Sequence, residues 1–89
     1  MENEGNKYLL TALDIRILSK LQDTKSKFNQ NSLAREVISS SNDVGKHIER
    51  LRVYGLVKIE KKDNIKHISL NDTNIEDVET ILRIFKRFI

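Results

Sequence analysis

The chain has 89 residues, the size of one small domain, with a formal net charge of +3, 33% charged and 38% hydrophobic residues. It contains no cysteine, which excludes disulfides, thiol catalysis and thiolate metal sites. No apolar run approaches the roughly 20 residues that span a bilayer, and the polar N-terminus lacks the apolar segment of a signal peptide. We therefore expect a soluble cytoplasmic domain, whose stability at this size would gain from dimerisation.

Three helices are predicted where apolar residues recur at helical spacing, over residues 12–23, 32–38 and 41–54. Ile38 is expected to be buried at the end of the second helix. Gly55 is placed to end the third helix in the left-handed conformation. Side chains that can cap the helices precede each of them, namely Thr11 with Asp14, Asn29 or Asn31, and Ser40 with Asp43.

A β-hairpin and a fourth helix are predicted in the C-terminal third. Residues 56–61 and 65–70 read as two strands, and 62–64 supply turn residues, so that the hairpin has a basic tip. Thr73 with Glu76 forms the pattern of a capping box, which predicts a helix from there to the C-terminus.

The predicted fold class is mainly α with a two-stranded β wing, the winged helix-turn-helix. The order helix, helix, tight turn, helix, hairpin, helix leaves one face of the third helix free, and an α-helix fits the major groove of DNA. We divide the chain into a flexible N-terminal arm (1–8), a winged-helix DNA-binding domain (9–71) and a C-terminal helix (72–89).

The segment from Ser40 to Leu51, followed by Tyr54-Gly55-Leu56-Val57, resembles the recognition helix and the start of the wing in winged-helix transcription regulators. The nearest comparison is with the MarR and ArsR groups and related small archaeal and viral DNA-binding proteins, over residues 9–70. The resemblance implies sequence-specific binding of double-stranded DNA, with the third helix in the major groove and the wing on the backbone or minor groove. Gly45 is a departure, because the family often has Ser or Thr there. The expected DNA-contacting residues are Ser41, Asn42, Gly45, Lys46, Glu49, Arg50, Lys61, Lys62, Asn64 and Lys66.

Charge is distributed in agreement with DNA binding. Residues 44–67 hold seven Lys or Arg and three Asp or Glu, a net +4, whereas the remaining residues sum to −1. Such an excess can grip phosphate in a salt-sensitive way, although it can also be only a solvated charged face. Asp43 and Glu49 are unfavourable beside DNA, unless Glu49 accepts a hydrogen bond from a cytosine amino group.

The two acidic residues keep other functions open. A winged helix can serve as a protein-interaction module in transcription or replication machinery, because fold alone does not decide function. A non-specific architectural DNA-binding protein would share the same basic surface.

The last helix carries a broad apolar stripe, with acidic residues early and basic residues late. We interpret it as a dimerisation helix that pairs antiparallel with a second copy, the alternative being packing onto its own domain. A two-fold dimer predicts a pseudo-palindromic DNA site. The residues expected at the dimer interface are Ile75, Val78, Ile81, Leu82, Phe85, Phe88 and Ile89.

Nothing in the sequence points to catalysis, a metal site or a cofactor. His47 and His67 are the only histidines, and no Gly-x-Ser-x-Gly elbow or glycine-rich phosphate loop occurs. We expect His47 at the edge of the core or near phosphate, and His67 on the hairpin surface. The sequence therefore predicts a homodimeric transcription regulator, associated with the nucleoid when bound to DNA, and not an enzyme.

Overall fold

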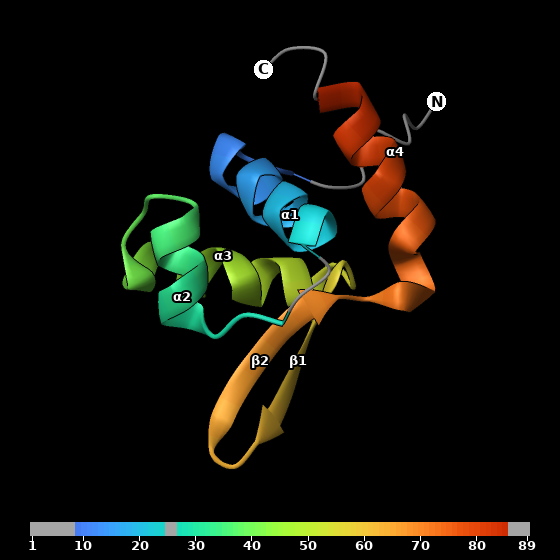
Figure 1. The fold of residues 1–89 in the computed structure, drawn as a ribbon. Helices are drawn as coiled ribbons and strands as arrows, with labels where there is room; N and C mark the ends of the chain where they lie inside the picture. Colours follow the sequence, from blue (N-terminus) through green and yellow to red (C-terminus); the bar gives the residue numbers. More distant parts are fainter. Residues whose placement is uncertain (1–8, 25–26, 86–89) are drawn as a thin grey trace.

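The computed structural model describes residues 9–24 and 27–85 as four α-helices and a two-stranded antiparallel sheet (Figure 1). This is the predicted winged helix-turn-helix arrangement, and the fold prediction is confirmed. The elements are α1 (Ala12–Thr24), α2 (Gln30–Glu36), α3 (Ser41–Val53), β1 (Val57–Lys62), β2 (Ile65–Leu70), a 3-10 helix η2 (Asp72–Asn74) and α4 (Ile75–Phe85).

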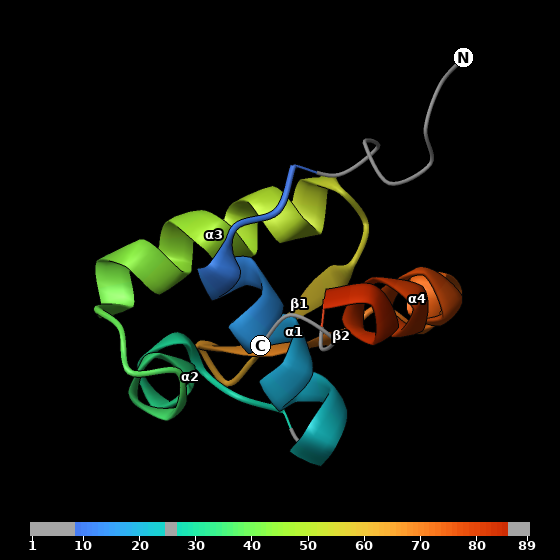
Figure 2. The same cartoon turned by 90° about the horizontal axis from the view of Figure 1, so that it is seen from above.

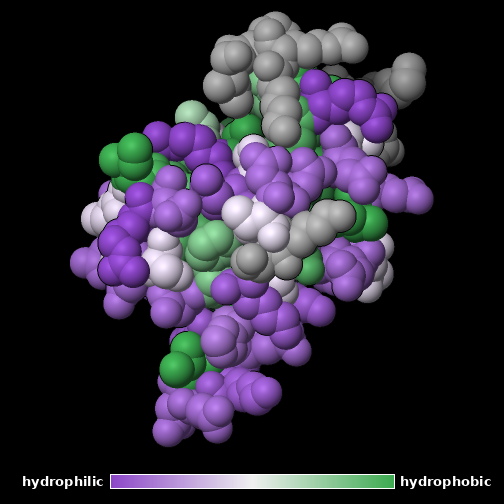
Figure 3. Space-filling model, viewed as in Figure 1, coloured by the Kyte–Doolittle hydropathy of each residue, from purple (hydrophilic) through white to green (hydrophobic). Residues whose placement is uncertain are grey.

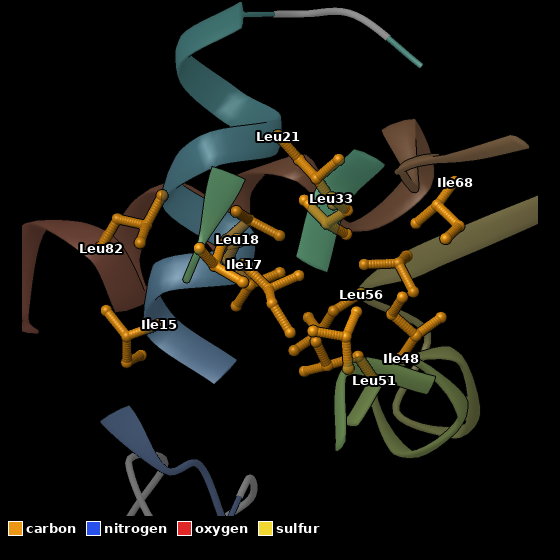
Figure 4. Packing of buried hydrophobic residues seen from close by; sticks show 14 of the residues in the cluster. Ile15, Ile17, Leu18, Leu21, Leu33, Ile48, Leu51, Leu56, Ile68 and Leu82 are labelled. Carbon is orange, nitrogen blue, oxygen red and sulfur yellow. The ribbon is translucent and has the colours of Figure 1, made fainter. Parts of the chain in front are cut away.

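Helix α1 is the centre of the domain, in contact with α3, α4 and β2 (Figures 1 and 2). Its apolar residues follow the helical period, so that Ile17 and Leu18 both point into the core and are fully buried. Leu33 from α2, Leu51 from α3 and Leu56 ahead of β1 meet them there (Figure 4). One continuous core therefore holds α3 from behind and leaves its opposite face open to solvent.

The wing is a hairpin in which β1 pairs with β2 from Val57–Leu70 at the base to Lys62–Ile65 at the tip. Asp63 and Asn64 make the two-residue turn, with φ of +54° and +65°, conformations that Asp and Asn tolerate well. Phe28 pairs with Ile68 on the outer side of β2 and ties the connector after α1 to the base of the wing. The tip itself is exposed, and it extends away from the helices (Figure 1).

Helix α2 differs from the expected one in its bounds and in its last residue. Asn29 is the cap that the structure uses, in a reciprocal capping box with Ser32, so the helix starts at Gln30 and ends at Glu36. The prediction that Ile38 is buried is wrong, because 86% of its surface is exposed. Ile38 adopts the left-handed conformation (φ +54°) in the turn into α3, which takes it out of the helical period that would have pointed it inward.

The start of the last helix also differs from the expectation. The side chain of Asn71 accepts a hydrogen bond from the Thr73 backbone N–H, and a 3-10 turn precedes α4. Asn71 and Asn74 both donate to the carbonyl of Gly55, at 3.0 and 2.7 Å. The chain before α4 is therefore fixed onto the end of α3 by amide side chains, in place of the expected Thr73–Glu76 capping box.

Helix α4 packs against α1 through its apolar stripe. Val78, Ile81 and Leu82 are buried in this chain's own core, so the expectation that all seven stripe residues face a second copy is corrected for these three. Ile84 and Phe85 keep 48% and 38% of their surface exposed near the C-terminal end of the helix. Phe88 and Ile89 lie outside the described residues.

Candidate nucleic-acid interface

The inner side of α3 is anchored to α1 by a buried carboxylate. Asp14 is fully buried, and its Oδ1 lies 2.7 Å from Nδ1 of His47 while its Oδ2 accepts a hydrogen bond from Arg50. The predicted cap is confirmed in the same place, because Thr11 N–H donates to Asp14 Oδ2 at 2.8 Å and Asp14 N–H donates to the Thr11 hydroxyl at 3.3 Å. Asp14 thus takes part in the cap at the start of α1 and also binds two side chains of α3.

This anchor changes the interpretation of Arg50. Its guanidinium is directed inward onto Asp14, and its Nε is buried without a hydrogen-bond partner in the described part of the chain. His47 is likewise held at the edge of the core, with 22% of its side chain exposed. The edge of the core is one of the two positions predicted for it. Arg50 is therefore corrected from a group that faces DNA freely to one with an internal ion pair.

The outer side of α3 carries a different set of residues. Asn42, Lys46, Glu49 and Val53 are all exposed, as the helical period requires for positions opposite the buried stripe of Val44, Ile48 and Leu51. Arg52, at the end of this side, donates to Glu49.

Polar contacts between α2 and α3 fix the start of this face. Gln30 Nε2 donates to the Ser41 carbonyl at 2.8 Å, and the Ser41 hydroxyl donates to Asn31 Oδ1 at 2.7 Å. The amide of Gln30 passes so close to Gly45 that a Cβ at Gly45 would lie 2.7 Å from Nε2. Gly45, the departure from the pattern of the resembled family, thus leaves space for the Gln30 side chain of α2.

A groove of about 410 Å³ separates α3 from the wing. Four isoleucines line it, Ile48, Ile59, Ile65 and Ile68. Its polar lining residues are Asn29, Gln30, Asn31, Glu49, Asn64 and Lys66. Most of these side chains offer amide groups, which can both donate and accept hydrogen bonds.

The wing supplies the unpaired positive charge of this surface. Within the described part of the chain, Lys61, Lys62 and Lys66 form no ion pair, and neither does Lys46 on α3. The wing at the lower end of Figure 3 is mostly hydrophilic. We refer to these four lysines as the lysine set.

Two acidic residues near the lysine set have lysine or arginine partners. The hydrogen bond from Arg52 lowers the pKa of Glu49, and the charge of Lys66 lowers it further. Lys27 lies 3.1 Å from Glu60, and this hydrogen bond lowers the pKa of Glu60. Both carboxylates are thus ionised at neutral pH, and both reduce the positive potential beside the wing.

The structure brings four of the predicted DNA-contacting residues, Gly45, Glu49, Asn64 and Lys66, to the groove between α3 and the wing. Ser41, Gly45 and Arg50 are half-buried, and the other seven are exposed on α3 or the wing. Sequence reasoning missed Asp14, which it places only in a cap, and Gln30, which falls between the helices predicted over 12–23 and 32–38. The sequence signal for Gln30 was weak, but the glycine inside a helical pattern marked a close approach by another group.

Among the described residues there is no group of three or more His, Asp or Glu side chains that could hold a metal ion. No described helix is long and apolar enough to cross a membrane.

Comparison with solved structures shows that the chain is similar in fold to winged-helix regulators. A variant of MepR from S. aureus bound to an oligodeoxyribonucleotide matches with a TM-score of 0.75 and 20% identity, covering 89% of this chain and 60% of MepR. The chain has the winged-helix fold. A homodimeric winged helix-turn-helix DNA-binding domain from Mycobacterium bovis, a possible ArsR-family regulator, matches at 0.70 and 15% identity over 94% of this chain and 72% of that one. A MarR-family regulator from Silicibacter pomeroyi matches at 0.74 and 16% identity, over 86% and 53%.

These structures bear out the resemblance at the level of fold. The chain spans about 60% of MepR and about half of the Silicibacter regulator. No protein-family model matches the sequence, and no curated protein matches it.

Proposed function

We propose that this winged-helix chain is a homodimeric transcription regulator that binds double-stranded DNA sequence-specifically. The observation that carries the proposal is the lysine set, four cations on α3 and the wing that form no ion pair with the described residues. One of them, Lys66, lines the groove between α3 and the wing. Cations that no protein carboxylate neutralises are available for phosphate. The DNA-bound MepR variant has the same fold.

In this proposal α3 enters the major groove with its outer side, and the wing lies along the backbone or minor groove. Asn42 and Lys46 reach base edges, with Ser41 and Gly45 at the approach from α2. Lys61, Lys62, Lys66 and Asn64 contact phosphate and sugar. Arg50, which is bound to Asp14, positions α3 and reads no base.

The dimer forms through the C-terminal end of α4 in this proposal. Ile84 and Phe85 are exposed there, and the acidic first turn and Arg83 in the last turn complement each other in an antiparallel pair. The Mycobacterium bovis domain of the same fold is homodimeric. A two-fold dimer would place its half-sites about 34–36 Å apart, one turn of DNA.

The proposal assigns the chain to the cytoplasm, on the nucleoid when bound to DNA, and gives it no enzymatic activity. A protein-interaction module remains the second candidate, because Asp43 and Glu49 are exposed on α3. A negative charge on that side opposes phosphate and suits a basic protein partner.

The test is fluorescence anisotropy of the protein with a labelled duplex at about 50 and 200 mM salt, the range over which phosphate-dominated binding weakens steeply. We expect binding at the lower salt that weakens strongly at the higher. Lys61→Ala with Lys62→Ala should lower the affinity and reduce the salt slope by roughly 0.9 for each phosphate that is no longer neutralised. Lys20→Ala, which removes a lysine paired with Glu36, is the matched control and should bind like the unchanged protein. Absence of salt-dependent binding to any duplex would favour the protein-interaction function.

Sedimentation equilibrium tests the dimer. Phe85→Asp should shift the protein toward monomer and weaken binding to a two-half-site duplex, because a charge at an apolar interface is costly to bury. Ile38→Asp is the control, since Ile38 is also an exposed apolar residue but lies in the turn before α3. A monomeric unchanged protein at all concentrations up to about 100 μM, well above the roughly micromolar range of weak specific dimers, would exclude this interface.

A further inference from the structure

Glu49 is an acid at the centre of a surface that is proposed to meet a polyanion. It lies in the middle of the outer side of α3, one turn beyond Gly45, and 59% of its side chain is exposed. It also lines the groove between α3 and the wing. An acid there weakens non-specific binding to phosphate. Its presence therefore needs an explanation other than contact with phosphate.

One oxygen of the Glu49 carboxylate is bound by Arg52. Arg52 donates to Oε1 through both Nε, at 3.0 Å, and a terminal guanidinium nitrogen. Oε2 accepts no hydrogen bond from any of the described residues. One oxygen is thus fixed by the protein, and the other is left to accept a hydrogen bond from outside it.

The acceptor is ionised near neutral pH in the free protein. The hydrogen bond from Arg52 lowers the pKa of Glu49 below its ordinary value of 4.5, and the charge of Lys66 acts in the same direction. A carboxylate in this state accepts hydrogen bonds and donates none.

Base edges in the major groove differ in what they offer to such a group. Guanine presents the acceptors N7 and O6, and thymine presents O4, all of which repel a carboxylate. Adenine presents its N6 amino group beside the acceptor N7, whereas cytosine presents its N4 amino group alone. Resting on the proposed function, we infer that Glu49, positioned by Arg52, is a specificity-determining residue that selects cytosine at one position of each half-site.

The competing explanation is that Glu49 and Arg52 form only a surface ion pair three residues apart on a helix. Such pairs contribute little to stability, and removing one would leave the DNA preference unchanged. Base preference is therefore the readout that separates the two explanations.

The experiment is selection of bound duplexes from a random-sequence library by the full chain and by Glu49→Gln and Glu49→Ala. The unchanged protein should enrich cytosine about tenfold at one position per half-site, corresponding to the lower part of the discrimination given by a good base contact. Glu49→Gln should move that preference to adenine, because an amide donates to N7 and accepts from N6. Glu49→Ala should lose the preference and bind a generic duplex more tightly, since a repulsive charge is removed.

Glu79→Gln provides the matched control, because it makes the same change of charge at an exposed position of α4 outside its acidic first turn. It should keep the cytosine preference. The preference should also be the same at about pH 6 and about pH 8, because both lie above the ordinary pKa of a glutamate.

Each outcome bears on a different statement. A cytosine preference that survives in Glu49→Ala, or that is absent from the unchanged protein while salt-dependent binding persists, overturns this inference and leaves DNA binding intact. Absence of salt-dependent binding by the unchanged protein overturns the proposed function and this inference with it.

Discussion

The two sides of α3 use charged residues in opposite ways. On the inner side, Arg50 and His47 are held by the buried Asp14 of α1, and their polar groups are used within the protein. On the outer side, Lys46 has no ion pair with a described residue, and Glu49 keeps one oxygen unoccupied. Position on the helix alone does not tell these roles apart. The partner that the fold supplies decides whether a charge is neutralised within the protein or left free at its surface.

Breaking the inner side should produce the largest effect. Asp14→Ala leaves Arg50 and His47 without their carboxylate, and it should lower the free energy of unfolding by about 3 kcal/mol. This is the low end for a broken buried ion pair, because Arg50 keeps 39% of its side chain in solvent. Urea unfolding followed by circular dichroism measures the change. Glu79→Ala, which removes an exposed carboxylate, is the control and should stay within about 0.5 kcal/mol. A similarly small change in Asp14→Ala would show that the anchor contributes little.

The outer side can be probed where α2 approaches α3. Gly45→Ala gains about 1 kcal/mol of helix propensity, but its Cβ displaces the Gln30 amide and its hydrogen bonds to Ser41, which is a destabilisation of similar size. We therefore expect little net change in the free energy of unfolding. In a Gln30→Ala background the same substitution should stabilise the protein by about 1 kcal/mol. A double-mutant cycle measures the difference, and equal effects of Gly45→Ala in both backgrounds would contradict the close packing.

The turn that leads into α3 should give a smaller effect than the loss of the Asp14 anchor. Ile38 is β-branched and holds a left-handed conformation while exposed to solvent, which is unfavourable for such a residue. Ile38→Asn should raise the free energy of unfolding by about 0.5–1 kcal/mol, because Asn tolerates this conformation and the side chain it replaces is not part of the core. Thermal unfolding checks this, with Val53→Asn as an exposed control on α3 that should not stabilise. A decrease in the stability of Ile38→Asn would mean that the exposed isoleucine side chain stabilises the fold.

The arrangement of elements was predictable from sequence because it depends on periodicity and on turn residues. The stripe Val44, Ile48 and Leu51, the left-handed Gly55 and the Asp63-Asn64 turn each specify local structure through nearby residues. The second helix was predicted two residues late, because two asparagines competed for the role of cap.

The parts of the site that escaped prediction depend on residues far apart in the chain. Arg50 meets Asp14 across 36 positions, and nothing local to either residue announces the pair. The same is true of α4, where the apolar stripe did not tell whether α1 or a second copy covers it. Val78, Ile81 and Leu82 turned out to serve the domain's own core. Periodicity shows which face of a helix is apolar, whereas the tertiary structure decides what packs against that face.

The wing has a structural independence with a practical consequence. Its base is fixed by Val57 and Ile68 in the core, but the last three residues of β1 and the turn that follows them are exposed. The outer part of the hairpin can therefore be exchanged, lengthened or re-charged with little effect on the helices, since it takes no part in the core. The tip of the wing can therefore vary while the helices and the base of the wing stay the same. It is the part of this surface that can change, in evolution or by engineering, at the least risk to folding.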